Sequence, residues 1–256
     1  MFYSKNLKKI LEIKHCFFSK KNGKSKGIYK SLNCGIGSND KKSNVNQNLR
    51  IVSKKFNIDV KYLTLMNQTH SNKVKIIKKL NGQKKLNCDA ILTKSNKLAL
   101  SVLTADCVPI LIYEKRRKII GCIHAGWKGA ISGIIENTLK KLRSMGGKKE
   151  NLLVSIGPCI SKKNYEVKKD FYYEFVKKSK NNTYFFSRKN KDLFNFDLRG
   201  FVNKKFIEAG VTQIENIYLD SFAAKNEYFS HRRAKKLGED DYGRCISVIK
   251  KISLQN

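Results

Sequence analysis

Long apolar stretches and paired cysteines are both missing from this 256-residue sequence. No run approaches the roughly 18 consecutive apolar residues that a membrane-spanning helix needs. The opening segment MFYSKNLKKILEIK is too charged to hold the apolar core of a secretory signal peptide. The seven cysteines are scattered without a CxxC pair, which is not typical of a disulfide framework or a zinc ribbon. We therefore expect a cytoplasmic protein that does not bind membranes.

Proline is scarce as well, with two in the chain, and neither an internal repeat nor a low-complexity linker divides the sequence. The hydrophobic content of 41% indicates a globular protein, and 256 residues are enough to bury a substantial core. The simplest prediction is one continuous α+β domain over residues 1–256.

Acidic residues are few, with 20 against 54 basic ones, so the formal net charge is +34. Such an excess is compatible with a basic nucleic-acid-binding protein, and this alternative stays open. Arginine, however, supplies only nine of the basic residues, and the lysines occur in almost every segment. A dispersed lysine-coated surface without specific nucleic-acid binding is the preferred interpretation. The charge also favours an anionic substrate or phosphate.

Hydrophobic periodicity predicts alternating strands and helices along the chain. Strands are expected at 13–19, 62–66, 74–77, 89–93, 100–103, 108–113, 118–124, 152–156, 214–218 and 245–252. Helices are expected at 44–56, 130–145, 166–178 and 198–209. A charged loop, FSHRRAKKLGEDDYGR, is expected before the final strand.

A β-hairpin predicted over residues 108–124 organises the centre of the chain. If its turn consists of residues 114–117, Cys107 lies directly opposite His124. Residues in such positions share a face, with Cβ atoms roughly 4.5–5.5 Å apart. A thiolate and an imidazole at this separation can bind one metal ion or act as a nucleophile and its base.

The other histidines extend this site. His70 follows a predicted strand in the polar segment QTHSN, where no packing reason explains an imidazole. His15 and His231 have weaker cases, because one precedes an apolar pair and the other lies in a basic loop. His70, Cys107 and His124 would together form the ligand set of a catalytic zinc site with an open fourth position.

Two other interpretations of the cysteines remain open. Cys107 could be the nucleophile of a metal-free cysteine hydrolase, with His124 as its base. Cys122 shares the predicted face of His124 and is a reserve ligand, although a buried core position suits it better.

Several motifs in this order resemble the laccase-domain family. They are Asn67-Gln68-Thr69-His70, TADCVPIL at 104–111, HAGWKG at 124–129, IGPCIS with Tyr165-Glu166-Val167, and FSHRR at 229–233 with Tyr242-Gly243-Arg244. Members of this family are described as purine nucleoside phosphorylases with adenosine deaminase activity, and some as polyphenol oxidases or peptidoglycan editing factors.

The resemblance implies an α+β fold, a mixed β-sandwich with flanking helices. It also implies that His70, Cys107 and His124 bind Zn²⁺, with copper as the alternative ion, and that they are the catalytic residues. Purine nucleosides and phosphate are the implied substrates, and adenosine deaminase and methylthioadenosine phosphorylase activities are implied as well. Editing of a peptidoglycan precursor is an alternative role.

Substrate contacts are expected from three further residues: Asn33 within the SLN segment, and Arg232 and Arg233 within FSHRR. The case for the arginines is that a guanidinium can bind phosphate through two hydrogen bonds. The chain departs from the family pattern at two places, at His15-Cys16 near its start and at His231 in the C-terminal loop.

Overall fold

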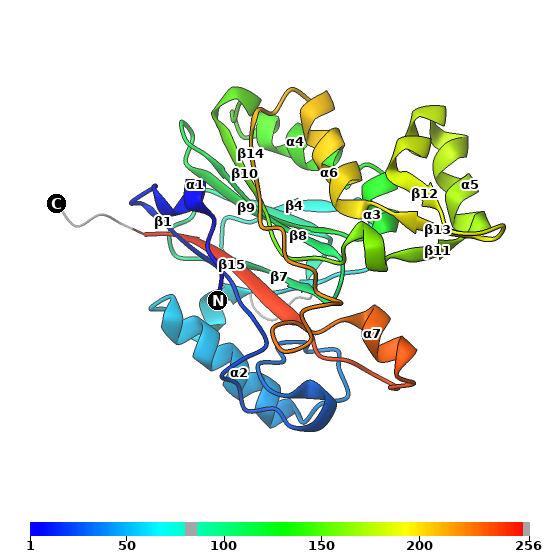
Figure 1. The fold of residues 1–256 in the computed structure, drawn as a ribbon. Coiled ribbons are helices and arrows are strands. Elements are labelled where there is room, and N and C mark those ends of the chain that lie inside the picture. Colours follow the sequence, from blue (N-terminus) through cyan, green and yellow to red (C-terminus); the bar gives the residue numbers. More distant parts are fainter. Residues whose placement is uncertain (80–85, 253–256) are drawn as a thin grey trace.

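Two mixed β-sheets form the centre of the computed structural model, which describes residues 1–79 and 86–252 (Figure 1). The smaller sheet has four strands in the order β1 (Ile13–Phe17), β15 (Cys245–Lys251), β7 (Ala99–Thr104) and β2 (Leu63–Thr64). The larger sheet has six strands in the order β14 (Gln213–Asn216), β10 (Leu152–Ile156), β8 (Val108–Glu114), β9 (Ile119–Ala125), β6 (Ala90–Thr93) and β4 (Val74–Ile76).

The two sheets pack face to face because their central strands are apolar on both sides. In β8, Leu111 and Tyr113 join the cluster between the sheets, whereas Ile110 and Ile112 face the outer layer of helices. This alternation follows from the two-residue period of a strand. The strand β7 behaves in the same way, with Leu100 and Val102 facing the larger sheet. The predicted α+β fold, a mixed sandwich with flanking helices, is confirmed.

Helices cover the outer faces of both sheets (Figure 1). The larger sheet is covered by α3 (Trp127–Ile131), α4 (Ile134–Ser144) and α6 (Leu198–Glu208). The smaller sheet is covered by α2 (Lys42–Lys55). Within the described residues, no helix combines the length and apolar character needed to cross a membrane.

A third sheet lies beside α5 (Lys169–Lys178), at the right of Figure 1. Its strands are β11 (Glu166–Lys168), β13 (Leu193–Phe196) and β12 (Phe186–Arg188). The remaining short elements are α1 (Lys5–Lys8), α7 (His231–Lys236), the paired strands β3 (Met66–Asn67) and β5 (Leu86–Asn87), and 3₁₀ turns at Gly27–Tyr29, Val60–Tyr62, Lys149–Asn151, Lys162–Asn164 and Lys180–Phe185.

Three predicted elements were wrong in part. The single helix expected over 130–145 is two helices, because Gly133 between them has a φ of 90° and interrupts the helical path. The helix expected to begin at Glu166 begins at Lys169, since residues 166–168 pair with β13. The charged loop contains α7, whose N-cap Ser230 accepts a hydrogen bond from the Arg233 amide.

The predicted register of the central hairpin was wrong by two residues. His124 pairs with Pro109 rather than Cys107, and the turn consists of residues 115–118, with Lys118 in the left-handed region at a φ of 53°. A shift by an even number of residues leaves every side chain on its predicted face of the sheet. His124 and Cys107 therefore still approach one another from the same side, although they are not directly opposite.

Candidate metal centre

Three side chains from three separate segments converge at one end of the sandwich. His70 follows β3, Cys107 precedes β8, and His124 lies in β9. Their potential ligand atoms all lie within 4.8 Å of one another, and among the described residues no other group of three or more His, Cys, Asp or Glu side chains meets this condition. The Cys107 Sγ atom is 3.6 Å from His70 Nε2. The two imidazole rings meet edge to face, with centroids 4.8 Å apart.

A buried carboxylate fixes the orientation of His124. The Asp89 side chain is fully buried and lies 2.8 Å from His124 Nδ1, which donates a hydrogen bond to it. The backbone amide of His124 also donates to the Asp89 carbonyl at 2.7 Å. Because Nδ1 is bound to Asp89, Nε2 is the ring nitrogen that is left to face the cluster.

The same carboxylate holds the loop that carries His70. It accepts hydrogen bonds from the His70 amide at 3.0 Å, the Ser71 amide at 2.7 Å and the Ser71 hydroxyl at 2.6 Å. This network stabilises His70 in the left-handed region, at a φ of 59°. Burial alone would raise the pKa of Asp89, but hydrogen bonds from His124 and Ser71 outweigh burial and lower the pKa to about 2. Asp89 therefore positions both histidines, a role that the sequence analysis missed.

A second buried acid positions the turn before Cys107. Asp106 has a φ of 84°, and its carboxylate accepts hydrogen bonds from the Ser221 hydroxyl at 2.7 Å, the Ser230 hydroxyl at 2.9 Å and the Arg232 amide at 2.7 Å. These contacts connect the turn to Ser221 and to the N-terminal end of α7, which contains Arg232. The backbone before Cys107 is thus held by residues that lie between positions 221 and 232 of the chain.

The electrostatic environment favours the thiolate of Cys107. Burial would raise the pKa of this thiol, but the charge of His124 and the hydrogen bonds from His124 and His70 outweigh burial and lower it to about 6. The same interaction raises the pKa of His124 against the effect of its own burial. A thiolate is the form of cysteine that binds metals and acts as a nucleophile.

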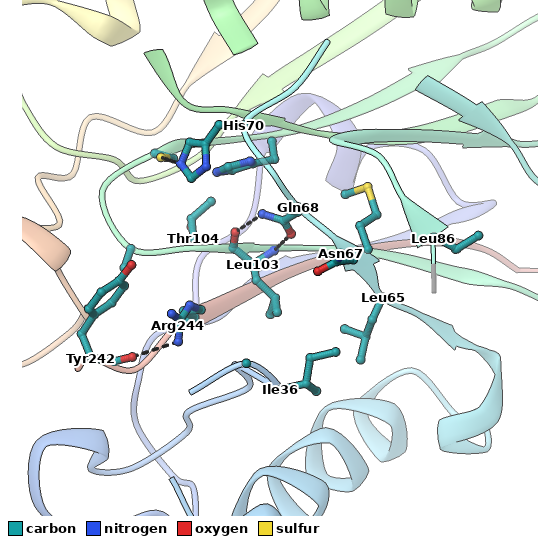
Figure 2. Close-up of a pocket in the computed structure, with 15 residues that line it drawn as sticks. Ile36, Leu65, Asn67, Gln68, His70, Leu86, Leu103, Thr104, Tyr242 and Arg244 are labelled. Carbon is teal, nitrogen blue, oxygen red and sulfur yellow. Dashed lines mark hydrogen bonds between the residues drawn. The ribbon is translucent and has the colours of Figure 1, made fainter. Parts of the chain in front are cut away.

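The cluster opens into a cavity of about 460 Å³, within the range of roughly 300–1,000 Å³ found for small-molecule sites. Figure 2 shows His70 at one side of this cavity, and Arg244 and Tyr242 at the opposite side. The apolar wall of this cavity is formed by Ile36, Leu65, Met66, Leu86 and Leu103.

The residues expected to contact substrate have other partners. Asn33 is fully buried, Arg232 donates to the Glu166 carbonyl, and the Arg233 guanidinium donates to backbone carbonyls of its own loop region. None of the three lines the cavity as described, and the arginine that does so is Arg244. The motif Tyr242-Gly243-Arg244 was noted in the sequence, but nothing there separated Arg244 from the two arginines of FSHRR.

The other candidate ligands lie outside the cluster. Cys122 is fully buried in the core between the two sheets, so the core interpretation replaces its reserve role. His15 is buried in β1, where its Nε2 atom accepts a hydrogen bond from the Ser4 amide at 2.8 Å. His231 begins α7 and contacts the Tyr242 ring at 4.9 Å between centroids.

Comparison with known proteins places this geometry in a family. The family described as multi-copper polyphenol oxidoreductase laccase matches residues 14–251. The chain belongs to this family. It is 36% identical over 218 residues to a protein of Rickettsia conorii named purine nucleoside phosphorylase, covering 82% of this chain and 88% of the relative. A protein of Bacteroides thetaiotaomicron with the same name is 29% identical over 233 residues, covering 86% of both chains.

Solved structures of similar proteins share the fold of this laccase-family chain. A Neisseria meningitidis protein, 25% identical, superposes with a TM-score of 0.85, covering 95% of this chain and 96% of the other. A hypothetical protein of Bacillus licheniformis, 24% identical, superposes with a TM-score of 0.87, covering 94% and 93% of the two chains.

Proposed function

We propose that this chain is a zinc-dependent purine nucleoside phosphorylase. The observation that carries the proposal is the convergence of two imidazoles and one thiolate on a cavity of about 460 Å³. The names of the Rickettsia and Bacteroides relatives support the choice of reaction, because both are called purine nucleoside phosphorylase and both align over most of their length. Purine nucleosides and phosphate are then the substrates.

The donor set fits a single zinc ion. Bonds of about 2.0–2.3 Å in tetrahedral geometry place neighbouring ligand atoms roughly 3.3–3.8 Å apart, and the distance of 3.6 Å between Cys107 Sγ and His70 Nε2 falls in this range. Two imidazoles and one thiolate also suit a single copper ion. Several coppers would need more ligands than this site offers, since the chain has four histidines and His15 and His231 lie elsewhere. Bound zinc would supply a Lewis acid at the open side of the cluster.

The other residues of the cavity shape a site for a nucleoside. The Gln68 side chain accepts from the Leu103 amide at 2.9 Å and donates to the Leu103 carbonyl at 2.7 Å, so it fixes the wall rather than facing a ligand (Figure 2). The apolar wall suits the faces of a purine ring. In phosphorolysis, a phosphate oxygen forms a bond to ribose C1′ while the bond from C1′ to the purine nitrogen breaks, and the departing purine takes up a proton.

Product identification on a nucleoside panel tests this function. Purified protein of measured metal content is incubated with adenosine, inosine, guanosine or methylthioadenosine, with and without phosphate. We expect free base and the pentose 1-phosphate to appear only when phosphate is present. Ammonia release from adenosine without phosphate would add the deaminase activity. A protein with stoichiometric zinc that releases no base from any of the four nucleosides would overturn the proposal.

Asp89→Asn should weaken zinc binding roughly 10–100-fold, the usual effect of removing the carboxylate partner of a metal-binding histidine. Asparagine keeps one acceptor oxygen but presents an N–H₂ group to the donors of His124 and Ser71. Competition with a chromogenic chelator measures the affinity. Asp192→Asn, an exposed acid, is the matched control and should bind zinc like the unmodified protein. Equal affinities for the two variants would contradict the role of Asp89.

A further inference from the structure

Arg244 stands out among the residues that line the cavity. It alone among the described lining residues carries a permanent positive charge. It directly precedes β15, whose first residue, Cys245, pairs with Thr104 of β7. Because Thr104 leads within three residues to Cys107, this pairing fixes Arg244 relative to the metal cluster. Figure 2 shows its guanidinium on the side of the cavity opposite His70.

The charge of this guanidinium is only partly compensated by the protein. Within the part of the chain that the structure describes, it makes one hydrogen bond, from Nη1 to the Tyr242 carbonyl at 3.2 Å, and stacks over the Tyr242 ring at 4.6 Å. The nearest carboxylate, Asp241, is 3.8 Å from Nη2 and also accepts from the Asn39 amide at 2.7 Å and the Tyr29 hydroxyl at 2.9 Å. A guanidinium has five N–H donors, so most of them remain for a ligand.

The N-terminal loop is built around this side chain. The buried Asn33 Oδ1 accepts hydrogen bonds from the backbone amides of Arg244 and Gly35, each at 2.9 Å, and the Cys34 amide donates to the Arg244 carbonyl at 3.1 Å. Gly35 leaves the space that the side chain occupies. A Cβ atom at position 35 would lie 2.9 Å from Arg244 Cδ and 3.1 Å from Nη1.

We infer that Arg244 binds the phosphate co-substrate, and that Asn33 and Gly35 are positioning residues that act through it. This inference rests on the proposed phosphorolysis and names the group that recognises the anion. A guanidinium can donate two parallel hydrogen bonds to a phosphate, and such charge-assisted bonds are stronger than neutral ones. The nucleoside then lies between the phosphate at Arg244 and the metal cluster at the other side of the cavity. Asn33, expected from the sequence to touch substrate, contributes by holding Arg244.

Arg244→Gln should raise the KM for phosphate on the order of 10–100-fold, the effect of losing hydrogen bonds to a charged group. The KM for the nucleoside and the zinc content should change little, since the apolar wall and the three ligands are intact. Arg244→Lys keeps the charge without the paired donors and should give an intermediate KM. Gly35→Ala keeps Arg244 but displaces it, so it should raise the KM for phosphate in the same direction. Arg116→Gln removes an exposed arginine of the β8–β9 turn and is the matched control.

Calorimetric titration with inorganic phosphate measures phosphate binding without turnover. Together with the KM for phosphate, it separates this inference from the proposed function. If the unmodified protein releases base from nucleosides and Arg244→Gln has an unchanged KM for phosphate, the role of Arg244 is wrong while the function stands. If the unmodified protein has no phosphorolytic activity, the function fails, and phosphate binding that is lost in Arg244→Gln but kept in Arg116→Gln still supports the anion site. If Arg244→Gln does not fold, Arg244→Lys and Gly35→Ala decide the question. Phosphate binding that is equal in all folded variants overturns the inference.

Discussion

His70→Ala should lose bound zinc and nucleoside turnover together. His70 is exposed and lies on a loop outside the central hairpin, yet its Nε2 atom approaches Cys107 Sγ at 3.6 Å. Removing one of three ligands should exceed the roughly 10–100-fold loss that follows removal of an outer partner of a metal ligand. Elemental analysis gives the metal content, and the phosphate-dependent release of base gives the turnover. The folded state of the variant is checked by circular dichroism.

Cys107→Ser extends this test to the alternative of a metal-free cysteine hydrolase. Serine is a poor zinc ligand compared with a thiolate, so on the zinc hypothesis this variant should resemble His70→Ala in both measurements. A nucleophile–base pair of Cys107 and His124 would not need His70. In that case Cys107→Ser would be inactive, His70→Ala would keep considerable activity, and chelators would have little effect. Full activity of the unmodified enzyme in excess chelator would therefore decide for the thiol mechanism.

The strands of the sandwich were predictable because burial on both faces leaves a clear signal. The apolar runs of β8, β9 and β10 are continuous in the sequence, and the strand 152–156 was predicted with the observed bounds. Elements that depend on distant partners were harder. Residues 166–168 form a strand only because they pair with β13, and the local pattern there is equally compatible with a helix. The hairpin register depends on the left-handed conformation of Lys118, which its residue type does not indicate.

The convergence of His70, Cys107 and His124 was largely predictable, whereas the residues that support it were not. Cysteine and histidine are rare in this chain, so His70, Cys107 and His124 could be selected by residue type and local context. The roles of Asp89 and Arg244 arise from contacts across long stretches of sequence, which no local pattern indicates. The hydrogen bond from His124 to Asp89 spans 35 positions, and the one from the Arg244 amide to Asn33 spans 211. In the sequence, Asp89 is only the first residue of the strand predicted at 89–93.

Gly126→Ala should disrupt the metal site by adding a single methyl group. Gly126 has φ −75° and ψ 162°, a conformation that alanine adopts without strain. Its Cβ atom, however, would lie 2.4 Å from His70 Cδ2 and 3.1 Å from Cys107 Sγ. Because His70 is exposed, the loop can relieve this overlap by turning the imidazole outward, so the fold should survive while a ligand is displaced. We expect zinc affinity and phosphorolysis to fall at least as far as in Asp89→Asn, by roughly 100-fold or more.

Gly37→Ala is the matched control for this substitution. Gly37 also lines the cavity, but a Cβ atom there would meet no other atom within 4 Å, so its zinc affinity should equal that of the unmodified protein. Zinc affinity is compared by chelator competition, and thermal unfolding of the metal-free proteins shows whether either change affects the fold itself. If Gly126→Ala binds zinc as tightly as Gly37→Ala, His70 cannot approach the ion from the position that it has here. The zinc site would then have to be assigned to Cys107 and His124 without His70.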